Sequence, residues 1–317
     1  MTRIGNSDLD VFPLSLGGNV FGWTADRDAS FAVLDAFVEG GGDFVDTADG
    51  YSAWVPGNSG GESETIIGEW LASRKPEGVV VATKVSQHPD FTGLAASNVR
   101  KAAEASLGRL GVDTIDLYYA HFDDETVPLE ETVAAFGQLV ADGLVRNVAV
   151  SNYTADRIRE WVEIARRIGV AVPVAVQPHY NLVHRNDVEE TIIPVAEEFG
   201  LGLVPYYSLA SGFLTGKYRS ADPEGQSSPR AAGAAKYATD AGLRIIDTLE
   251  QIGDAHGSSI AATSLAWLRA QPTVVAPIAS ARTVEQVPDL LAGARLELTA
   301  DEVEALDRVS AWTPTTA

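Results

Sequence analysis

Residues 79–121 read VVVATKVSQHPDFTGLAASNVRKAAEASLGRLGVDTIDLYYAH and contain one complete unit of the fold. The segments Val79–Val85 and Thr114–Ala120 are short, apolar and rich in β-branched residues, which predicts buried strands. Between them, Ala95–Leu110 carries apolar residues at helical spacing. A strand, a helix and a strand in this order predict two parallel strands joined by a right-handed crossover.

The same alternation extends over the rest of the chain. Further strands are predicted at Leu14–Leu16, Asp43–Thr47, Val145–Ser151, Val174–Pro178, Leu201–Tyr206 and Val274–Ile278. Further helices are predicted at Asp28–Glu39, Glu62–Ser73, Leu129–Asp142, Ala155–Ile168, Val188–Phe199, Ala238–His256 and Val284–Leu290. Eight strand–helix units predict an α/β protein with the (β/α)8 TIM-barrel architecture. A length of 317 residues suits one barrel, so we expect a single domain over residues 1–317.

Three features lie outside these units. The segments Arg3-Ile4 and Leu9–Phe12 predict an N-terminal β-hairpin that closes the lower face of the barrel. Extra helices are predicted at Ser258–Ala270 and Ala300–Ser310. The polar stretch SADPEGQSSPRAAG at 220–233 predicts a lid or surface loop at 217–236, with an inert disordered insertion as the alternative.

A doubly wound nucleotide-binding fold is the alternative architecture. Such a fold usually carries the pattern G-x-G-x-x-G after its first strand. Here the corresponding turn reads GGNVFG at 17–22, which does not fit. The barrel is therefore the favoured prediction.

Composition excludes several classes of protein. The chain has 44 acidic and 23 basic side chains and a formal charge of −21, which disfavours nucleic acid and anionic membrane surfaces as partners. It contains no cysteine, which excludes disulfides and thiolate catalysis. No apolar run approaches the roughly 18 residues of a membrane span, and we expect a cytoplasmic location. Nothing in the composition indicates an oligomeric state.

Polar side chains end three consecutive predicted strands. Asp46, Lys84 and His121 close the second, third and fourth strands, at the rim where barrels of this kind hold their active sites. Because side chains alternate along a strand, the three converge at the mouth if their faces point inward. A desolvated lysine needs a counter-charge, and Asp46 is the candidate.

The loop after the second strand brings Tyr51 near the ammonium group of Lys84. A free phenol has a pKa of about 10, too high for efficient proton donation at neutral pH, and a neighbouring cation lowers it. We therefore expect Lys84 to lower the pKa of Tyr51, and Tyr51 to protonate a carbonyl oxygen that His121 orients. No side chain delivers the hydride that such a reduction requires, so the site needs a cofactor.

Three stretches that carry these four residues resemble the aldo-keto reductases. They are GDFVDTADGY at 42–51, ATKV at 82–85 and DLYYAH at 116–121. The resemblance covers nearly the whole chain in the right order and is closest to the bacterial general-reductase branch. It implies an NADPH-dependent oxidoreductase that reduces aldehydes or ketones, with Tyr51 as general acid, Lys84 as its pKa modulator, Asp46 as the partner of Lys84, and His121 orienting the substrate.

The resemblance also implies the cofactor contacts. Those to the nicotinamide are Ser151 and Asn152 in VSNY, Gln177 in VQPHYN, and the stacking ring of Tyr206. Those to the pyrophosphate are Leu209, Gly212, Leu214 and Lys217, and those near the adenosine are Ser280, Arg282 and Gln286. The alternatives are helix capping for Ser151 and Asn152, barrel packing for Tyr206, and a solvated helix start for Arg282.

The chain departs from the family's pattern at four places. Tyr206-Tyr207-Ser208-Leu209 lacks the proline of the usual YSPL, and Ala279-Ser280 replaces a Pro-Gly pair. Gln286 stands where some relatives carry arginine, and Asp289-Leu290 replaces a Glu-Asn pair. Ser280 and Arg282 still suit the 2′-phosphate of NADPH. NADPH is therefore the expected cofactor, with NADH as the alternative.

Substrate recognition is the least determined feature. Trp23, Trp54 and Phe122 lie in predicted rim loops and suit an apolar substrate funnel, with outer-shell packing as the alternative.

A metal-dependent hydrolase is one rival function, but the five histidines show no H-x-H or H-E-x-x-H spacing, so we expect no metal site. The other rival is a barrel that holds cofactor without turnover, as in family members that serve as channel subunits. The complete set of four site residues favours catalysis.

Overall fold

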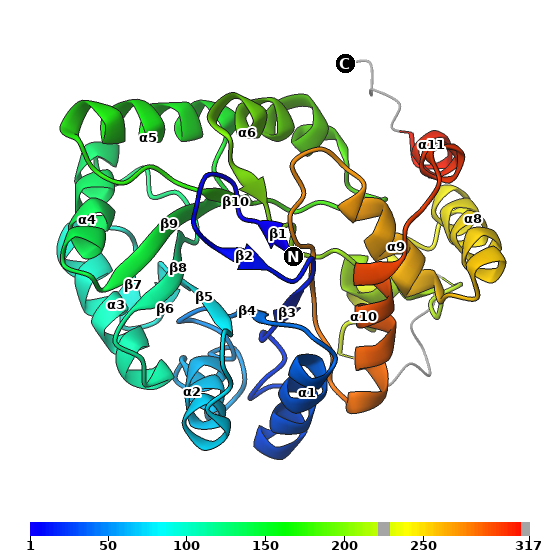
Figure 1. The fold of residues 1–317 in the computed structure, drawn as a ribbon, viewed down its shortest axis with the longest axis horizontal. Helices are drawn as coiled ribbons and strands as arrows, with labels where there is room; N and C mark the ends of the chain where they lie inside the picture. The colour runs from blue at the N-terminus through cyan, green and yellow to red at the C-terminus, as the bar shows by residue number, and fades with distance from the viewer. Residues whose placement is uncertain (221–228, 312–317) are drawn as a thin grey trace.

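The computed structural model describes residues 1–220 and 229–311, and its centre is an eight-stranded parallel sheet. The strands are β3 (Ser15–Gly17), β4 (Phe44–Asp46), β5 (Val80–Val85), β8 (Ile115–Ala120), β9 (Val145–Ser151), β10 (Ala175–Gln177), β11 (Gly202–Leu203) and β12 (Ile278–Ala279). They lie in the order β11-β10-β9-β8-β5-β4-β3-β12. The two edge strands, β11 and β12, are brought together by a parallel bridge between Leu203 of β11 and Val274, which precedes β12. The sheet therefore closes into the predicted (β/α)8 barrel (Figure 1).

Helices surround the barrel on its outer side (Figure 1). They are α1 (Arg27–Glu39), α2 (Glu62–Arg74), α3 (Ala96–Leu110), α4 (Leu129–Ala141), α5 (Ala155–Ile168), α6 (Ile193–Phe199), α7 (Ala231–Ala235), α8 (Asp240–His256), α9 (Ile260–Arg269), α10 (Val287–Arg295) and α11 (Ala300–Val309). Shorter helical turns are η1 (Val188–Ile192), η2 (Ala210–Thr215) and η3 (Val284–Gln286). Helix α5 shows ordinary capping at both ends. The Thr154 hydroxyl accepts a hydrogen bond from the Arg157 N–H at its start, and Gly169, with φ 73°, follows its last residue.

The lower end of the barrel is closed by the N-terminal hairpin, as predicted. Its strands β1 (Thr2–Arg3) and β2 (Asp10–Val11) are antiparallel. Ile4, Leu9 and Val11 are buried in the same cluster as inward-facing barrel residues such as Phe44 and Leu117. Figure 1 shows the hairpin across the centre of the ring. The interior is thus a packed core at this end, and the large cavity of the described residues lies at the opposite, carboxyl end of the strands.

Proline explains where the predicted strands were too long. The seventh strand, expected to reach Tyr206, ends at Leu203, and the eighth, expected at Val274–Ile278, is confined to Ile278–Ala279 with an isolated bridge at Val274. Pro205 and Pro277 lie in these stretches, and neither has an N–H to donate to a neighbouring strand. The predicted boundaries were wrong there by several residues, although both strands exist.

Three local features were not predicted. A small hairpin, β6 (Gln87–His88) and β7 (Phe91–Thr92), follows β5. The helix expected at Val188–Phe199 begins as the π-helical turn η1, just before Pro194, which lacks the N–H of a regular helix. Within the loop expected at 217–236, residues 231–235 form α7, so that part is helical rather than irregular. Residues 221–228 of that loop lie outside the described residues.

Candidate active site

The ammonium group of Lys84 is the centre of the site. It donates hydrogen bonds to Asp46 Oδ2 at 2.7 Å, to the Thr47 carbonyl oxygen at 2.6 Å and to Tyr51 Oη at 3.0 Å. The Lys84 and Asp46 side chains are 0% and 2% exposed. An ammonium has three N–H donors, and all three are used here. Lys84 is therefore fixed in position, and the sequence-based pairing of Asp46, Lys84 and Tyr51 agrees with this geometry.

Strand ends position each of these groups. Asp46 ends β4, and Lys84 lies next to the end of the neighbouring strand β5. The side-chain amide of Gln177, which ends β10, donates to Asp46 Oδ1 at 3.0 Å. Both carboxylate oxygens of Asp46 are thus hydrogen-bonded, which restrains its orientation across the mouth of the barrel. Gln177 was expected to contact a cofactor and here also supports Asp46.

The pKa of Tyr51 departs from the expectation. Burial, and then the Asp46 carboxylate, raise the pKa of Tyr51 well above its ordinary value instead of lowering it. Burial lowers the pKa of Lys84, and Asp46 opposes that shift. Asp46 was expected as the counter-charge of Lys84, but burial of the phenol and the effect of this carboxylate on it cannot be weighed against the cation from sequence alone. Tyr51 therefore keeps its proton at neutral pH, and Lys84 is placed to stabilise negative charge on Oη when the proton leaves.

His121 lies beside Tyr51 directly after β8, with the ring centroids 6.1 Å apart. Its Nδ1 is buried and has no hydrogen-bond partner among the described residues. Burial, and then the charge of Lys84, lower the pKa of His121 well below its ordinary value. The imidazole is therefore neutral at pH 7 and can serve as a hydrogen-bond donor or acceptor in the cavity but not as a cation.

A cavity of about 810 Å³ opens above this cluster at the carboxyl end of the strands. Asp46, Tyr51 and His121 line its inner end. Trp23, Trp54 and Phe122 also line it, and the Trp23 and Trp54 rings meet edge to face at 5.6 Å. Trp54 and Phe122 are 52% and 42% exposed, so both rings face open space. The structure therefore gathers the three predicted aromatic residues at one mouth.

On the opposite wall, Tyr206 and Asn152 hold each other. The Tyr206 hydroxyl donates to Asn152 Oδ1 at 2.7 Å, and the Asn152 amide donates to the His121 carbonyl oxygen at 2.9 Å. Asn152 has φ 57°, which is uncommon for a residue other than glycine. The ring of His179 stacks on Tyr206 at 5.4 Å between centroids. Ser151, whose hydroxyl donates to the Gln177 carbonyl oxygen, also lines the cavity.

The segment after Tyr206 has irregular backbone. Ser211 and Gly212 have φ 58° and 93°, which interrupts the helical turn η2. Leu209, Gly212 and Lys217 line the cavity as the sequence reasoning requires. Leu214 does not: its side chain is fully buried in the hydrophobic core. The reversal of the chain at Ser211 and Gly212 turns Leu214 inward, so its side chain packs instead of facing a ligand.

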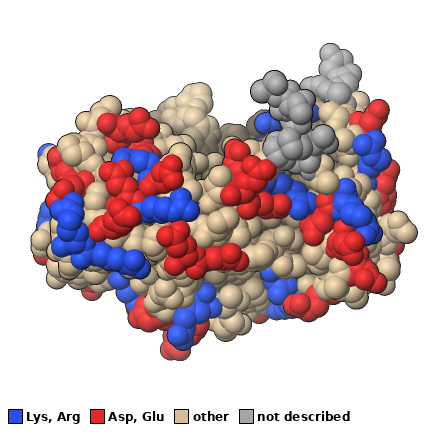
Figure 2. Space-filling view, turned by 90° about the horizontal axis from the view of Figure 1, so that it is seen from above, with Lys and Arg blue, Asp and Glu red and all other residues tan. Residues whose placement is uncertain are grey.

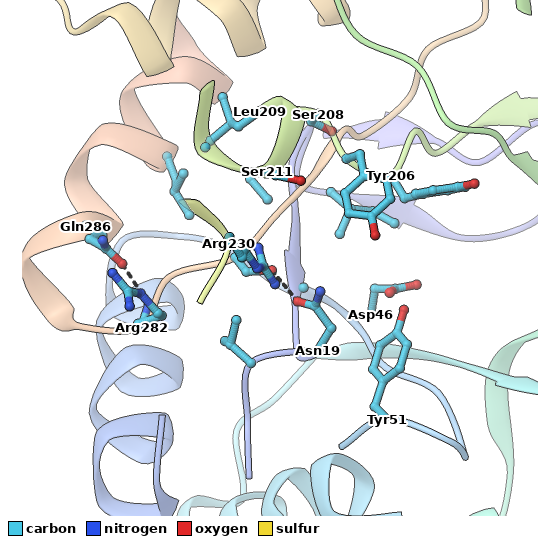
Figure 3. Close-up of a pocket in the computed structure, with 18 of the residues that line it drawn as sticks. Asn19, Asp46, Tyr51, Tyr206, Ser208, Leu209, Ser211, Arg230, Arg282 and Gln286 are labelled. Carbon is cyan, nitrogen blue, oxygen red and sulfur yellow. Dashed lines mark hydrogen bonds between the residues drawn. The ribbon is translucent and has the colours of Figure 1, made fainter. Parts of the chain in front are cut away.

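The far end of the cavity combines the end of β3 with the turn before α10. Ser280 donates a hydrogen bond to Asn19 Oδ1 at 2.7 Å, and a Cβ placed on Gly17 would lie 2.6 Å from Ser280 Oγ. The Arg282 N–H donates to Gln286 Oε1 at 2.7 Å (Figure 3). All of these residues line the cavity. Asn19 was not predicted, although its place directly after the first strand was a usable signal.

Comparison with known proteins identifies the family. The model of the aldo/keto reductase family matches residues 13–311. A probable voltage-gated potassium channel subunit beta of rice (Oryza sativa subsp. japonica) is 31% identical over 98% of this chain and 92% of that protein. The uncharacterized oxidoreductase YrpG of Bacillus subtilis is 31% identical over 97% of this chain and 95% of that protein. Norsolorinic acid reductase stcV of Emericella nidulans is 32% identical over 94% of this chain and 78% of that protein. The chain belongs to the aldo/keto reductase family.

Family membership makes the chain an oxidoreductase of a family that generally uses NAD(P)H to reduce carbonyl groups. The cavity fits such a cofactor in size and in chemistry. A volume of about 810 Å³ lies within the range of ligand sites. Tyr206 offers an aromatic face, and Lys217, Arg230 and Arg282 line the same cavity. The close approach of Gly17 to Ser280 leaves no room for a side chain at that wall.

Arg230 is a second cavity residue, after Asn19, that the sequence did not indicate as a functional group. Its guanidinium lies 5.5 Å from the Trp23 ring centroid, and Figure 3 places it between Arg282 and Tyr51. Burial lowers the pKa of Arg230, and the charge of Arg282 acts in the same direction. It follows the polar stretch 220–229, where no periodic pattern indicates which way a side chain faces. Arg230 thus adds a third basic side chain to the lining of this cavity, beside Lys217 and Arg282.

The cations of the cavity contrast with those of the outer surface. Most arginines outside the cavity pair with carboxylates, as Arg100 does with Glu104 at 3.0 Å and Arg167 with Glu130 at 3.0 Å. The face in Figure 2 shows basic and acidic side chains next to each other. Lys217 and Arg282 have no ion-pair partner among residues 1–220 and 229–311. In a chain of formal charge −21, two such cations in one cavity favour an anionic ligand.

The described residues of this aldo/keto reductase also lack a metal-binding cluster and a membrane-spanning helix. No group of three or more His, Asp or Glu side chains among them is arranged to hold a metal ion. Nor does that part of the chain contain a helix with the length and apolar character needed to cross a bilayer.

Proposed function

We propose that this protein is an NADPH-dependent reductase that converts aldehydes or ketones to alcohols, with Tyr51 as the proton donor. One observation carries the proposal: Lys84 Nζ lies 3.0 Å from Tyr51 Oη while it is paired with Asp46 at 2.7 Å. A phenol held against a buried ammonium is suited to give up a proton only when negative charge develops nearby. A carbonyl oxygen under reduction is such a centre.

In this mechanism the protein supplies the proton and the geometry. Tyr51 keeps its proton in the resting site because its pKa is raised. His121, which is neutral, donates a hydrogen bond to the carbonyl oxygen and orients it toward Tyr51. NADPH, when bound, supplies the hydride. Lys84 stabilises the phenolate as the proton leaves, and Asp46 keeps Lys84 in place.

The cofactor is proposed to lie along the wall from Tyr206 to Gln286. Tyr206 would stack on the nicotinamide, and Ser151, Asn152 and Gln177 would bind its carboxamide. Leu209, Gly212, Lys217 and the newly found Arg230 would surround the pyrophosphate. Ser280, Arg282 and Gln286 would bind the adenosine end, where the unpaired guanidinium of Arg282 favours NADPH over NADH.

Small carbonyl compounds are the proposed substrates, and Trp23, Trp54 and Phe122 are proposed to contact their apolar parts. The exposed faces of Trp54 and Phe122 support this role. The single-domain organisation, the lid at 217–236, the cytoplasmic location and the absence of nucleic-acid partners stay predictions.

A cofactor-holding barrel without significant turnover is the second candidate. A relative named as a probable potassium channel subunit beta, matched over 98% of this chain, supports it. Such a protein would bind NADPH tightly and oxidise it only slowly. The ordered contacts of Lys84 with Asp46 and Tyr51 favour catalysis.

The deciding experiment is an absorbance assay of NADPH oxidation with a panel of aliphatic and aromatic aldehydes and ketones. We expect saturable oxidation of NADPH with at least one class, slower oxidation of NADH, and alcohol formed in equal amount. Tight NADPH binding without turnover across the panel would favour the non-catalytic alternative. Weak binding of both cofactors would overturn the cofactor assignment.

A further inference from the structure

Asp49 is a buried carboxyl group that the proposed mechanism does not use. It lies three residues after Asp46 and two before Tyr51, and its relative exposure is 0%. Both of its carboxyl oxygens are buried without a hydrogen-bond partner of ordinary geometry among the described residues. Asp49 is not part of the cavity lining. Asp49 and Tyr51 thus belong to the same loop between β4 and α2, but the Asp49 side chain does not face the cavity.

The charges around Asp49 do not balance. Lys84 is paired with Asp46, and Arg109 is paired with Glu64 at 2.6 Å. Asp49 is therefore a third carboxyl group beside two cations that already have partners. A buried carboxylate without a cation of its own is strongly disfavoured relative to the neutral acid.

Groups from every neighbouring element face Asp49. They are Glu64 from α2, Arg109 from α3, Tyr118 from β8, Lys84 from β5, and Tyr51 from its own loop. Glu64 is fully buried and accepts a further hydrogen bond from the Thr83 hydroxyl at 2.5 Å. The Tyr118 hydroxyl, like Asp49, is buried without a partner among the described residues. The pocket behind the loop is thus closed to bulk water.

The backbone around Asp49 joins the Tyr51 loop to β5. The Asp49 N–H donates to the Lys84 carbonyl oxygen at 3.1 Å. At the next position, a Cβ on Gly50 would lie 2.9 Å from the carbonyl carbon and oxygen of Gln87, so only glycine allows this approach. The Asp49 side chain is enclosed at this junction. The protonation state of Asp49 therefore affects how Tyr51 is held against Lys84.

We propose that Asp49 is a positioning residue for the proposed carbonyl reduction. It stays uncharged in the interior and so keeps the Tyr51 loop docked on the strand that carries Lys84. The inference rests on the proposed function, because its consequence is a change in proton donation by Tyr51. It adds a group that acts through Tyr51 without contacting substrate or cofactor.

Ionisation of Asp49 has a defined consequence. Burial, and then the charge of Glu64, raise the pKa of Asp49 to about 8, against the backbone amides of Gly50 and Ser86. Above that pH the new negative charge raises the pKa of Tyr51 further and makes it a weaker acid. It also introduces an unpaired charge at the loop junction. We therefore expect carbonyl reduction to slow as the pH rises through about 8.

The first test compares pH profiles of kcat for NADPH-dependent carbonyl reduction. In the wild type, kcat should fall above pH 8 by up to about tenfold per pH unit. Asp49→Asn resembles the neutral acid, so it should keep the neutral-pH rate within about threefold and lose this fall. Asp90→Asn, at an exposed carboxylate nearby, should leave the profile unchanged. An unaltered profile in Asp49→Asn would overturn the proposal.

A second variant tests the direction of the effect. Glu64→Gln removes the charge that helps to keep Asp49 protonated, so the fall in kcat should move to lower pH. This variant keeps the proposal testable if Asp49→Asn does not fold. A fall that stays in place, or moves to higher pH, would contradict it.

A readout independent of activity separates this inference from the proposed function. Infrared difference spectra between about pH 6 and about pH 10 should show loss of a protonated-carboxyl band in the wild type that is missing in Asp49→Asn. If this band is absent from the wild-type spectra, Asp49 is ionised over the whole pH range, and the inference is wrong. If the band is present but no carbonyl compound is reduced, the proposed function fails while the protonation of Asp49 stands.

Discussion

The two ends of the cavity are built in different ways. At the inner end, Asp46, Lys84 and Gln177 come from strands and are joined by hydrogen bonds of 2.7 and 3.0 Å. At the outer end, Ser211 and Gly212 have left-handed backbone, and the cations Lys217 and Arg282 lack carboxylate partners among the described residues. Asp46 and Lys84 at the inner end are thus hydrogen-bonded within the protein. The outer end, in contrast, is arranged for a ligand that brings its own negative charge.

This difference separates chemistry from binding. Groups on strands are held by the barrel ladder and by each other, which suits a proton donor whose position decides the rate. Loop backbone and unpaired cations suit the recognition of a cofactor that must enter and leave. We therefore expect substitutions at the inner end to change kcat or stability, and substitutions at the outer end to change cofactor affinity.

The largest effect is expected from Tyr51→Phe at the inner end. The variant removes the proposed proton donor but keeps the ring, so kcat should fall by about 10²- to 10⁴-fold while NADPH affinity is unchanged. Stopped-flow turnover and fluorescence titration measure the two quantities. Tyr153→Phe removes a buried hydroxyl that has no partner among the described residues, and it is the matched control with near-normal kcat. Near-normal turnover of Tyr51→Phe would refute the acid assignment.

Lys84→Met tests whether the inner end is held together by its own charges. The variant leaves the Asp46 carboxylate buried without a cation, which should lower the free energy of unfolding by about 3–5 kcal/mol. Adding Asp46→Asn should restore much of that loss, because the unpaired charge disappears. Urea unfolding measures both, with exposed Lys101→Met as the control. Equal stability of the single and double variants would show that the pair is not electrostatically coupled.

The inner end was also the part that the sequence predicted best. Asp46, Lys84 and His121 follow from period-two alternation and from the rule that barrel sites lie at strand ends. The direction of the Tyr51 pKa was wrong, because sequence reasoning located the cation but could not weigh burial and Asp46 against it. Fold class depends on pattern, whereas a pKa depends on distances that only the folded chain defines.

The outer end was predicted less completely, for a physical reason. Leu214 was expected at the pyrophosphate but packs in the core, because the positive φ values at Ser211 and Gly212 redirect the chain. Arg230 was expected only as part of a loop, yet it lines the cavity. Periodicity fixes the facing of side chains in strands and helices and says nothing about irregular backbone. The other residues that the family resemblance assigned to this end line the cavity, and their contacts with a cofactor stay predictions.

Arg282→Ala tests the outer end with a smaller expected effect. Loss of one charge-assisted contact to the 2′-phosphate should raise the KM for NADPH by about 10- to 100-fold and leave the KM for NADH and kcat nearly unchanged. Arg308→Ala, which removes an exposed arginine paired with Glu304, is the control. Steady-state kinetics with both cofactors decide the matter. An equal effect on NADPH and NADH would remove Arg282 from phosphate recognition.

The smallest effect is expected where the two ends meet, at Tyr206. Tyr206→Phe keeps the proposed stacking face but loses the hydrogen bond from its hydroxyl to Asn152 Oδ1, so the ring and the amide are no longer held in register. One lost hydrogen bond of about 0.5–1.5 kcal/mol corresponds to about a 2- to 10-fold rise in the Kd for cofactor, with a smaller change in kcat. Tyr207→Phe alters the neighbouring, half-exposed ring and should leave the Kd unchanged. If the two variants bind cofactor equally well, the Tyr206–Asn152 hydrogen bond does not position the cofactor-binding wall. Asn152 would then belong with the outer end of the cavity, whose side chains are ordered by the ligand and not by each other.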